Sequence, residues 1–306
     1  MPSIVILGVF VADTAYRADR QPKMGETILG RSFVLGPGGK GSNQAVAAGM
    51  AGGDVSFVSR LGKDAFADMA RATWAKAGVK PVITDDPDSY TGAAYIFIEE
   101  ATGNNAIIIS PGAAARISVA DIEAQAALIG RAKVFITQLE QPMPAALRAL
   151  QIARAGGAKT ILNPAPAAPL TDQMLVLCDY VTPNETEAEA LTGLSVGTLA
   201  EAEKAADALM ARGVGAAIIT LGDKGALYRD RMRSVHVPVF KAGPVVETTG
   251  AGDAFNGGFA VALSEGRDPV EAVRFGCATA SISVTRPGTA PSMPSRAEIE
   301  ALLAKG

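Results

Sequence analysis

The sequence predicts an α/β protein built in three layers, with a parallel, Rossmann-like sheet flanked by helices. Two observations lead to this fold class. Short runs rich in β-branched residues alternate with alanine-rich stretches of helical character, and hydrophobic residues make up 48% of the 306 residues. Parallel strands need helical crossovers and a core on both faces of the sheet, and this pattern supplies both. We expect one domain over residues 1–306, because no linker, repeat or low-complexity tract divides the chain.

Each main element follows from this alternation, in chain order. The expected strands are the short apolar runs at residues 4–7, 55–59, 134–138, 160–163, 180–183 and 216–221. The expected helices are the longer runs that accompany them, at residues 42–51, 65–77, 119–129, 143–155, 185–191, 199–211, 253–263 and 269–284.

Two segments, residues 15–35 and 89–110, depart from this pattern. They alternate in polarity, carry turn residues such as Thr102-Gly-Asn-Asn105 and show little helical periodicity, so each predicts antiparallel strands. Together they are expected to form a small sheet that covers one edge of the main sheet. A sheet with a solvated face and open edges needs covering, which makes this one a candidate lid and a candidate homodimer surface.

Charge and cysteine content narrow the classes of partner. The 28 Lys and Arg nearly balance the 31 Asp and Glu, so no long-range field marks a binder of nucleic acid or anionic membranes. Cys178 and Cys277 are isolated, and a single histidine, His236, cannot build a His-rich metal site. No apolar run approaches the roughly 18 to 20 residues of a membrane span, and no signal peptide precedes the first strand. We expect a cytoplasmic protein with small-molecule partners.

A glycine-rich segment near residue 250 predicts an anion site. Gly250, Ala251 and Gly252 directly precede a helical run that begins near Asp253. Small residues let successive backbone N–H groups converge on an oxyanion, and the helix N-terminus adds partial positive charge. Asp253 has two interpretations: a helix N-cap, or a base that takes the proton of a hydroxyl attacking a phosphoryl group.

A second glycine cluster spans residues 36–49, before a helix. Its glycines would let the main chain approach a ligand, while Lys40 and Asn43 supply donors for hydroxyl groups. The cluster is not a Walker A loop, since Gly follows Lys40. Gly25 to Ser32 comes nearer to that motif but has Arg31 at the lysine position.

These clusters resemble the two signatures of the ribokinase-like, PfkB-type carbohydrate kinases. The first signature corresponds to Gly38-Gly-Lys-Gly-Ser-Asn-Gln and the second to Glu247-Thr-Thr-Gly-Ala-Gly-Asp253. Further segments resemble ribokinase motifs in the expected order, namely Asn163-Pro-Ala-Pro166, Thr182-Pro-Asn-Glu-Thr-Glu187, Ile219-Thr-Leu-Gly222 and Val284-Thr-Arg-Pro-Gly-Thr-Ala-Pro-Ser292. The resemblance covers almost the whole chain. It implies a parallel α/β sheet with a β-lid that often supplies a dimer contact, and phosphorylation of a sugar by ATP.

The resemblance also implies roles for individual residues. Asp253 would be the base, beside an anion nest at Gly250, Ala251 and Gly252. Sugar-binding positions would be Val11, Asp13, Gly39, Lys40, Asn43, Glu140 and Asp253. Nucleotide-binding positions would be Asn184, Glu187, Thr220, Gly222, Gly225 and Gly252, with Glu187 organising Mg²⁺ through water. A monovalent cation, expected to be K⁺, would lie near Glu247, Thr249, Ser283, Arg286, Gly288 and Ser292.

Two positions depart from the family pattern. Ribokinases typically carry Asn two residues before the Asp of the first strand-loop, where this chain has Val11, and Asp where it has Glu247. Valine makes no hydrogen bond, so the substrate stays open among ribose, 2-deoxyribose, a ketohexose and another sugar, with ribose first. The longer Glu247 would displace the cation or bind it in altered geometry.

Two other functions are alternatives to sugar phosphorylation. A non-catalytic sugar or nucleotide sensor could use the same fold, although such a protein has no need of an acid opposite the phosphate. A dinucleotide-dependent oxidoreductase would want Gly-x-Gly-x-x-Gly directly after the first strand. Here Gly8 is followed by Val-Phe-Val-Ala-Asp13, which disfavours that function.

Overall fold

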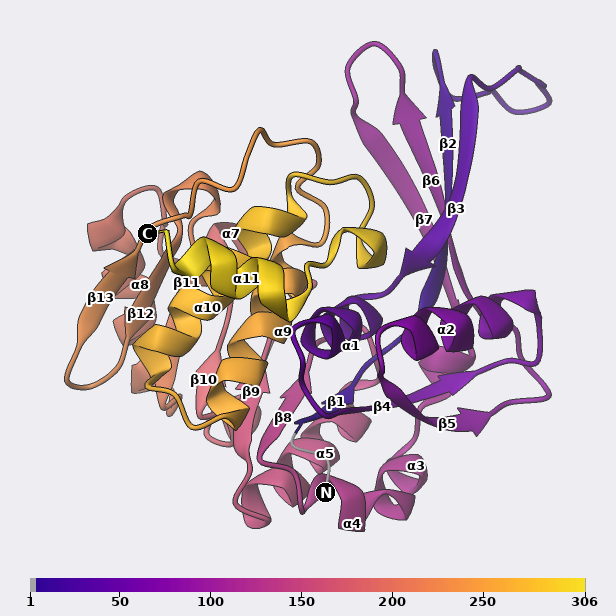
Figure 1. Ribbon diagram of the computed structural model, residues 1–306. Coiled ribbons are helices and arrows are strands. Elements are labelled where there is room, and N and C mark those ends of the chain that lie inside the picture. The colour runs from indigo at the N-terminus through magenta and orange to yellow at the C-terminus, as the bar shows by residue number, and fades with distance from the viewer. Residues whose placement is uncertain (1–3, 306) are drawn as a thin grey trace.

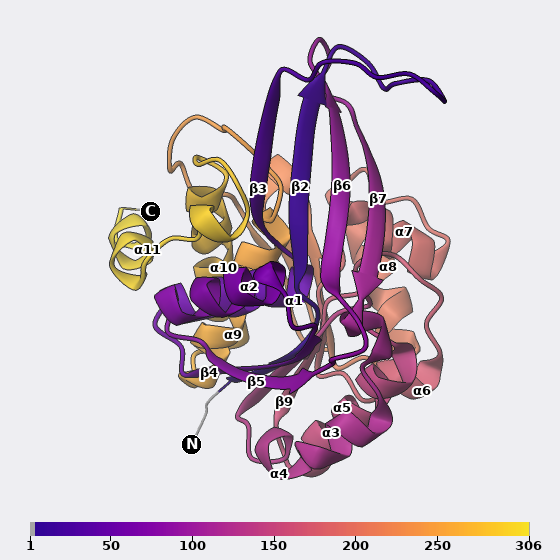
Figure 2. The ribbon, with the colours of Figure 1, turned by 90° about the vertical axis from the view of Figure 1, so that its right-hand side faces the viewer.

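The computed structural model describes residues 4–305 and contains a nine-stranded sheet with helices on both faces (Figures 1 and 2). The strand order is β13-β12-β11-β10-β9-β8-β1-β4-β5. From β5 to β11 all neighbours pair in parallel, whereas β12 and β13 are antiparallel. The bounds are β1 Ile4–Leu7, β4 Val55–Leu61, β5 Lys80–Asp85, β8 Val134–Thr137, β9 Lys159–Leu162, β10 Tyr180–Val181, β11 Ala216–Thr220, β12 Ala226–Arg229 and β13 Ser234–Val237.

The six predicted strands are all present, and the three-layer fold class is confirmed. The prediction missed β5, β12 and β13. β5 and β13 are the outermost strands, where solvent admits polar residues such as Lys80 and Asp85, whereas β12 is largely buried but only four residues long. Edge strands therefore lack the continuous apolar runs that identified the central ones.

Two hydrophobic cores hold the layers together, one on each face of the sheet. Alternate residues of β1 divide between them: Ile4 and Ile6 face one core, Val5 and Leu7 the other. The first core is completed by α1 Lys40–Met50, α2 Ala65–Lys76, α9 Ala251–Ser264, α10 Pro269–Ser283 and α11 Arg296–Leu303. The second is completed by α3 Val119–Ala124, α4 Ala126–Ile129, α5 Met143–Ala155, α6 Asp172–Leu175, α7 Glu185–Thr192 and α8 Leu199–Ala211. The helix predicted at 119–129 is thus two short helices that meet at Gln125.

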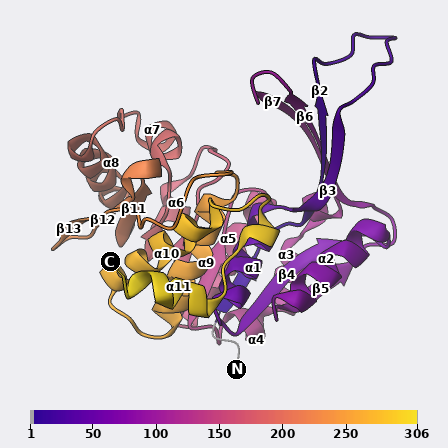
Figure 3. The same ribbon diagram turned by 45° about the horizontal axis from the view of Figure 1, so that its top comes forward.

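The segments outside the main pattern form a separate four-stranded sheet, the small sheet, which stands away from the large one (Figures 1 and 3). Its order is β3-β2-β6-β7, and the bounds are β2 Val11–Ala18, β3 Ser32–Gly38, β6 Thr91–Glu99 and β7 Asn105–Gly112. Each hairpin is antiparallel as predicted, but the central β2–β6 pair is parallel. In each hairpin the first strand runs away from the large sheet and the second strand returns toward it. The two first strands, β2 and β6, therefore run in the same direction.

Close packing between α1 and α9 brings the residues of the functional site together. A side chain at Gly257 would meet α1 at once, because its Cβ would lie 2.5 Å from Cβ of Ala47 and 2.9 Å from the carbonyl oxygen of Gln44. Asp253 lies one helical turn before Gly257, so its side chain leaves α9 on the same face, toward α1. No helix in residues 4–305 has the length and apolar character needed to cross a membrane.

Candidate active site

Asp253 is a buried residue inside the first turn of α9. The N-cap of this helix is Gly250, whose φ of 80° is left-handed, and Asp253 is the third residue of the helix. The N-cap interpretation of Asp253 is therefore excluded. Its carboxylate instead accepts two side-chain hydrogen bonds from α1: Oδ2 from Nδ2 of Asn43 and Oδ1 from Nε2 of Gln44, both 3.1 Å long.

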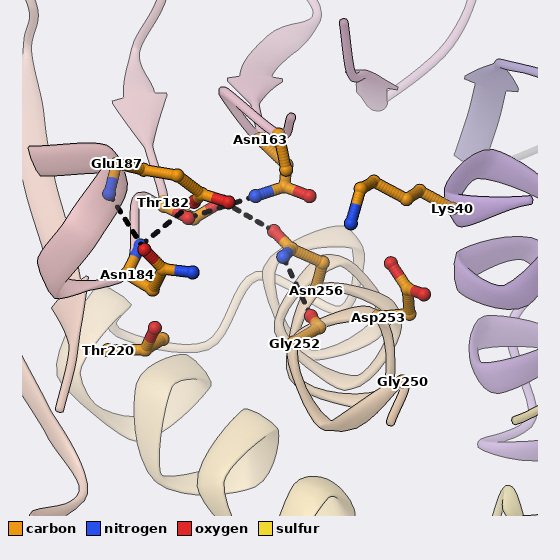
Figure 4. Close-up of a pocket in the computed structure, with 11 residues that line it drawn as sticks. Lys40, Asn163, Thr182, Asn184, Glu187, Thr220, Gly250, Gly252, Asp253 and Asn256 are labelled. Carbon is orange, nitrogen blue, oxygen red and sulfur yellow. Dashed lines mark hydrogen bonds between the residues drawn. The ribbon is translucent and has the colours of Figure 1, made fainter. Parts of the chain in front are cut away.

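Burial raises the pKa of Asp253, while the positive charge of Lys40 and the two amide donors act in the opposite direction. A base of this kind must be ionised to accept a proton, so these three partners favour the working form. Lys40 reaches the same space as Asp253 in Figure 4, opposite Asn184 and Glu187.

Backbone N–H groups at the start of α9 add an anion-binding element. Ala251 donates its N–H to the carbonyl of Thr248 at 3.1 Å. Within residues 4–305, no protein acceptor takes the N–H groups of Gly252 and Asp253. These two donors lie at the positive end of the α9 dipole, beside the pocket. An anionic group placed there would accept hydrogen bonds from both N–H groups and would be stabilised by the positive end of the helix dipole.

The pocket in Figure 4 joins α9 to the carboxyl ends of β9, β10 and β11. Seven of the predicted site residues line it: Lys40, Asn184, Glu187, Thr220, Gly250, Gly252 and Asp253. Four further residues also line it: Asn163, Ala165, Thr182 and Asn256. In a parallel sheet the carboxyl ends of neighbouring strands meet at one edge, which explains why ligand sites form there.

Two of these further polar residues stabilise the start of α9. Nδ2 of Asn256 donates to the carbonyl of Gly252 at 2.8 Å, and the Thr182 hydroxyl donates to Oδ1 of Asn256 at 2.7 Å. The contact ties the end of β10 to the anion-binding turn. The motif that carries Thr182 was noted in the sequence, but nothing there linked it to Asn256, which lies 74 residues later.

Glu187 has a structural role as well as a place in the pocket. Asn184 is the N-cap of α7, and the two residues form a capping box: Asn184 Oδ1 accepts from the N–H of Glu187, and Glu187 Oε2 accepts from the N–H of Asn184. Burial raises the pKa of Glu187. The hydrogen bond from the Asn184 N–H and the positive charge of Lys40 lower it, but by less. One carboxylate oxygen remains for a ligand or water.

Gly222 and Gly225 form the turn after β11, next to Thr220. Both have positive φ, 55° and 98°, and a Cβ on Gly225 would lie 2.0 Å from the carbonyl oxygen of Val237. Gly225 is therefore needed for close packing of the turn against the end of β13. The turn lies at the carboxyl end of β11, and the nearest neighbour of a Cβ on Gly222 would be Oε1 of Glu185 at 3.9 Å.

The predicted sugar side gathers carboxylates around the start of α1. Gly39, with φ of 88°, is the N-cap of α1, and the N–H of Lys40 donates to Oε2 of Glu140 at 2.8 Å. Burial raises the pKa of Glu140 to about 7; Lys40 opposes this rise, and the nearby Asp253 and Asp13 add to it. Burial also raises the pKa of Asp13 to about 6.

Val11 and Asp13 lie two residues apart on β2 and so share one face of the small sheet. Val11 is buried and is paired with Gly38 across the β2–β3 hairpin. A Cβ on Gly38 would lie 2.2 Å from Oδ2 of Asp13, so only glycine leaves room for that carboxylate.

The residues expected around a monovalent cation lie in the loop before α9 and in the segment that starts at the last residue of α10. Oε2 of Glu247 accepts the N–H of Gly288 at 2.8 Å, which joins the loops directly. The hydroxyls of Ser283 and Ser292 donate to the carbonyls of Ala280 and Thr289. Of the other expected positions, Arg286 forms an ion pair with Glu298, and Thr249 is exposed.

No group of three or more His, Cys, Asp or Glu side chains that could hold a metal ion occurs within residues 4–305. The acidic residue of the pocket on the Asn184 side is Glu187, and Lys40 and the start of α9 line the same pocket. This donor set fits an ion that brings most of its own oxygen ligands, as Mg²⁺ does with phosphate and water.

Comparison with known proteins decides the family. The family model described as pfkB family carbohydrate kinase matches residues 1–296. The chain is a pfkB family carbohydrate kinase. It is 38% identical over 297 residues to a ribokinase of Haemophilus influenzae, covering 97% of this chain and 96% of the relative. It is 36% identical over 294 residues to a deoxyribokinase of Salmonella typhi, covering 95% of each chain.

Solved structures agree with this assignment. The kinase superposes on an Arabidopsis thaliana ribokinase complexed with ribose and ATP with a TM-score of 0.93, at 31% identity and 99% coverage of this chain and 98% of the other. A Thermotoga maritima ribokinase gives a TM-score of 0.89 at 37% identity, covering 99% of this chain and all of the other. The small sheet and the parallel sheet both belong to this shared architecture.

Proposed function

We propose that this kinase works in the cytoplasm and transfers the γ-phosphoryl group of ATP to the primary, 5-hydroxyl of D-ribose, giving ribose 5-phosphate. The observation that carries the proposal is the buried carboxylate of Asp253, held by two amides beside the free N–H groups at the start of α9. A sugar on the Asp13 side and a phosphate on the Asn184 side would meet at this residue. The ribokinase relatives, one of them solved with ribose and ATP, support the choice of substrates.

In this reaction Asp253 accepts the proton of the sugar hydroxyl as its oxygen bonds to the γ-phosphorus, and ADP leaves. The N–H groups of Gly252 and Asp253 and the ammonium of Lys40 stabilise the charge on the transferred group. Asp13, Gly39, Asn43 and Glu140 hold the sugar hydroxyls. The turn at Gly222 and Gly225, with Asn184 and Thr220, holds the nucleotide. Glu187 would hold Mg²⁺ through water, and the bound ion would offset phosphate charge.

Replacing Asp253 by Asn tests the base. The change keeps the shape but removes the proton acceptor, so we expect kcat to fall by about 10²- to 10⁴-fold while sugar and ATP affinities change little. A coupled ADP-release assay and calorimetry measure the two quantities. Asp68, an exposed acid in the first turn of α2, is the matched control, and Asp68→Asn should keep normal turnover. Near-normal kcat in Asp253→Asn would refute the base. A wild type that binds ribose and ATP without turnover would favour a sensor.

Val11 supports 2-deoxyribose as the second candidate substrate. Valine lies on the same face of β2 as Asp13 and offers no hydrogen bond to a hydroxyl. A sugar that lacks one hydroxyl leaves no polar group unsatisfied at such an apolar wall. The deoxyribokinase relative, at 36% identity, accords with this alternative.

Replacing Val11 by Asn should favour ribose. A restored amide contact is worth about 1 to 3 kcal/mol, so the ratio of kcat/KM for ribose to that for 2-deoxyribose should rise by roughly 5- to 150-fold. Val11→Ala removes the same apolar contact without adding an amide and should leave the ratio nearly unchanged. An unaltered ratio in Val11→Asn would mean that the residue does not contact the distinguishing hydroxyl. A nucleoside preferred over both sugars would overturn the simple-sugar proposal.

We extend the proposal to activation by K⁺ between the loops of Glu247 and Gly288. The Glu247 carboxylate joins the loops by accepting the Gly288 N–H, and Gly250, the N-cap of α9, packs against Thr289 in the second loop. A cation held by carbonyl oxygens of these loops would order the anion-binding turn. We expect higher turnover in K⁺ than in tetramethylammonium at equal ionic strength, measured with saturating Mg·ATP. Equal rates in Na⁺, K⁺ and tetramethylammonium would eliminate cation activation.

We also propose that two copies associate through the small sheet. Its strands carry seven large apolar side chains that are between 41% and 65% exposed: Tyr16, Phe33, Val34, Leu35, Ile107, Ile108 and Ile109. Strands β3 and β7 are open edges, and a monomer rarely leaves such a surface uncovered. A second copy offers a surface of the same apolar character.

Sedimentation velocity tests this association. The wild type should sediment as a dimer at micromolar concentration, whereas Phe33→Asp combined with Ile108→Asp should sediment as a monomer, because charge on both hairpins opposes burial. Met232→Asp, at a fully exposed apolar residue between β12 and β13, is the matched control and should remain dimeric. A monomeric wild type, or a dimer unaffected by the double change, would contradict the proposed interface.

A further inference from the structure

We propose that Gln44 is a positioning residue, which fixes the orientation and the charge of Asp253 through a chain of buried amides that continues to Gln138 and Gln141. The inference rests on the proposed role of Asp253 as base. It adds a residue that touches neither the sugar nor the nucleotide in the proposed arrangement.

Gln44 is fully buried in α1 and uses both hydrogens of its amide nitrogen. Nε2 donates to Oδ1 of Asp253 at 3.1 Å and to Oδ1 of Asn163 at 3.0 Å. Asn163 in turn donates to the carbonyl of Thr182 at 3.0 Å, so its own amide is fixed as well. The base is thus connected through Gln44 to Asn163 at the end of β9, and through Asn163 to Thr182 at the end of β10.

The other end of Gln44 determines which way its amide points. Oε1 accepts a hydrogen bond from Nε2 of Gln138 at 2.7 Å. Gln44 presents its nitrogen to Asp253 because an ionised carboxylate can only accept, and the Gln138 donor on Oε1 matches this orientation, since the reversed Gln44 amide would place its oxygen against Asp253 and its nitrogen against the Gln138 nitrogen. Gln141 extends the chain, donating through Nε2 to the backbone carbonyl of Gln138 and to the hydroxyl of Thr137.

Two glycines make room for this chain. A Cβ on Gly8 would lie 2.5 Å from Oε1 of Gln138, and a Cβ on Gly41 would lie 2.8 Å from the same atom. The Gln138 amide therefore lies in a notch between the loop after β1 and the first turn of α1. Neither position could carry a larger residue without displacing it.

The two donors to Asp253 differ in how firmly they are held. Oδ1 of Asn43 is buried and has no partner among the described residues, so no second contact within them fixes the Asn43 amide. Gln44 is held at both ends. Oδ1 of Asp253 is consequently the anchored oxygen, and Oδ2, beside Asn43, is the oxygen left to meet the sugar hydroxyl.

The surroundings of Asp253 make such a donor necessary. Lys40 from α1 is the positive charge facing it, while the acids Glu140 after β8 and Glu187 of α7 face the same space, with Asp13 of β2 beyond Glu140. A buried carboxylate among other acids tends to hold its proton. An amide donor on Oδ1 stabilises the ionised form, so its removal raises the pKa of Asp253 and delays ionisation to higher pH.

Gln44→Met tests the inference, because methionine has a similar length and no donor. We expect the acidic limb of the kcat profile to move to higher pH by about one unit, so that kcat falls by up to about tenfold on that limb and recovers on the plateau at higher pH. KM values for sugar and ATP should change less than about threefold. Ser42→Ala is the matched control: it lies in α1, is fully buried and loses a 2.9 Å bond from Trp74 without contacting Asp253. Its profile should match the wild type.

A second variant and a second readout keep the test independent of turnover and of folding. Gln138→Met removes only the donor that orients Gln44, and it should shift the acidic limb in the same direction by a smaller amount. The ¹³Cγ titration of Asp253 by NMR should show the same upward shifts, whether or not the assay sugar is the right one. An inactive wild type would count against the proposed function alone. Superimposable Asp253 titrations in wild type, Gln44→Met and Gln138→Met would overturn the positioning role.

Discussion

The contact between α1 and α9 is the constraint on which the site depends. Gly257 has no side chain, so α9 lies directly against the backbone of α1 at Gln44 and Ala48. One turn earlier, the same face of α9 carries Asp253, which therefore reaches the amides of Asn43 and Gln44. A larger residue at 257 would separate the helices and with them the base and its donors. The glycines of the two signatures serve this packing as much as they serve ligand approach.

The packing of α1 against α9 also affects the pKa values of the acids in the site. Burial alone would keep Asp253, Glu140 and Asp13 protonated to higher pH than usual, and in each case burial is the largest cause of the raised pKa. Lys40 opposes the effect at Asp253 and Glu140, and the buried amides oppose it at Asp253 alone. The three acids therefore lie close together in different electrostatic environments, with Lys40 and two amide donors at Asp253, Lys40 at Glu140, and burial as the cause at Asp13. Such separation of neighbouring carboxylates by their environments is how one site can hold hydroxyl groups and remove a proton.

Much of the fold could be predicted because most strands and helices have a characteristic local pattern of apolar and polar residues. Central strands buried on both faces are continuous apolar runs, and all six were found at residues such as Val134 and Ala216. Edge strands such as β5 were missed, since their exposed and half-buried positions carry polar residues that interrupt the apolar run. The parallel pairing of β2 with β6 was missed for another reason: it depends on how two distant hairpins leave the body, which no local signal encodes.

The family, the two glycine signatures and the acid at position 253 can be read directly from the sequence, because each consists of residue types at fixed short spacings. The packing of the whole chain determines what holds that acid. It placed the N-cap at Gly250, left the N–H groups of Gly252 and Asp253 free, and brought Gln44 against a carboxylate 209 residues away. Hydrogen bonds between distant parts of the chain also place Asn163, Asn256 and Gln138 at the site. Hydrogen bonds between distant side chains depend on how helices and strand ends pack, and that packing is a property of the whole fold.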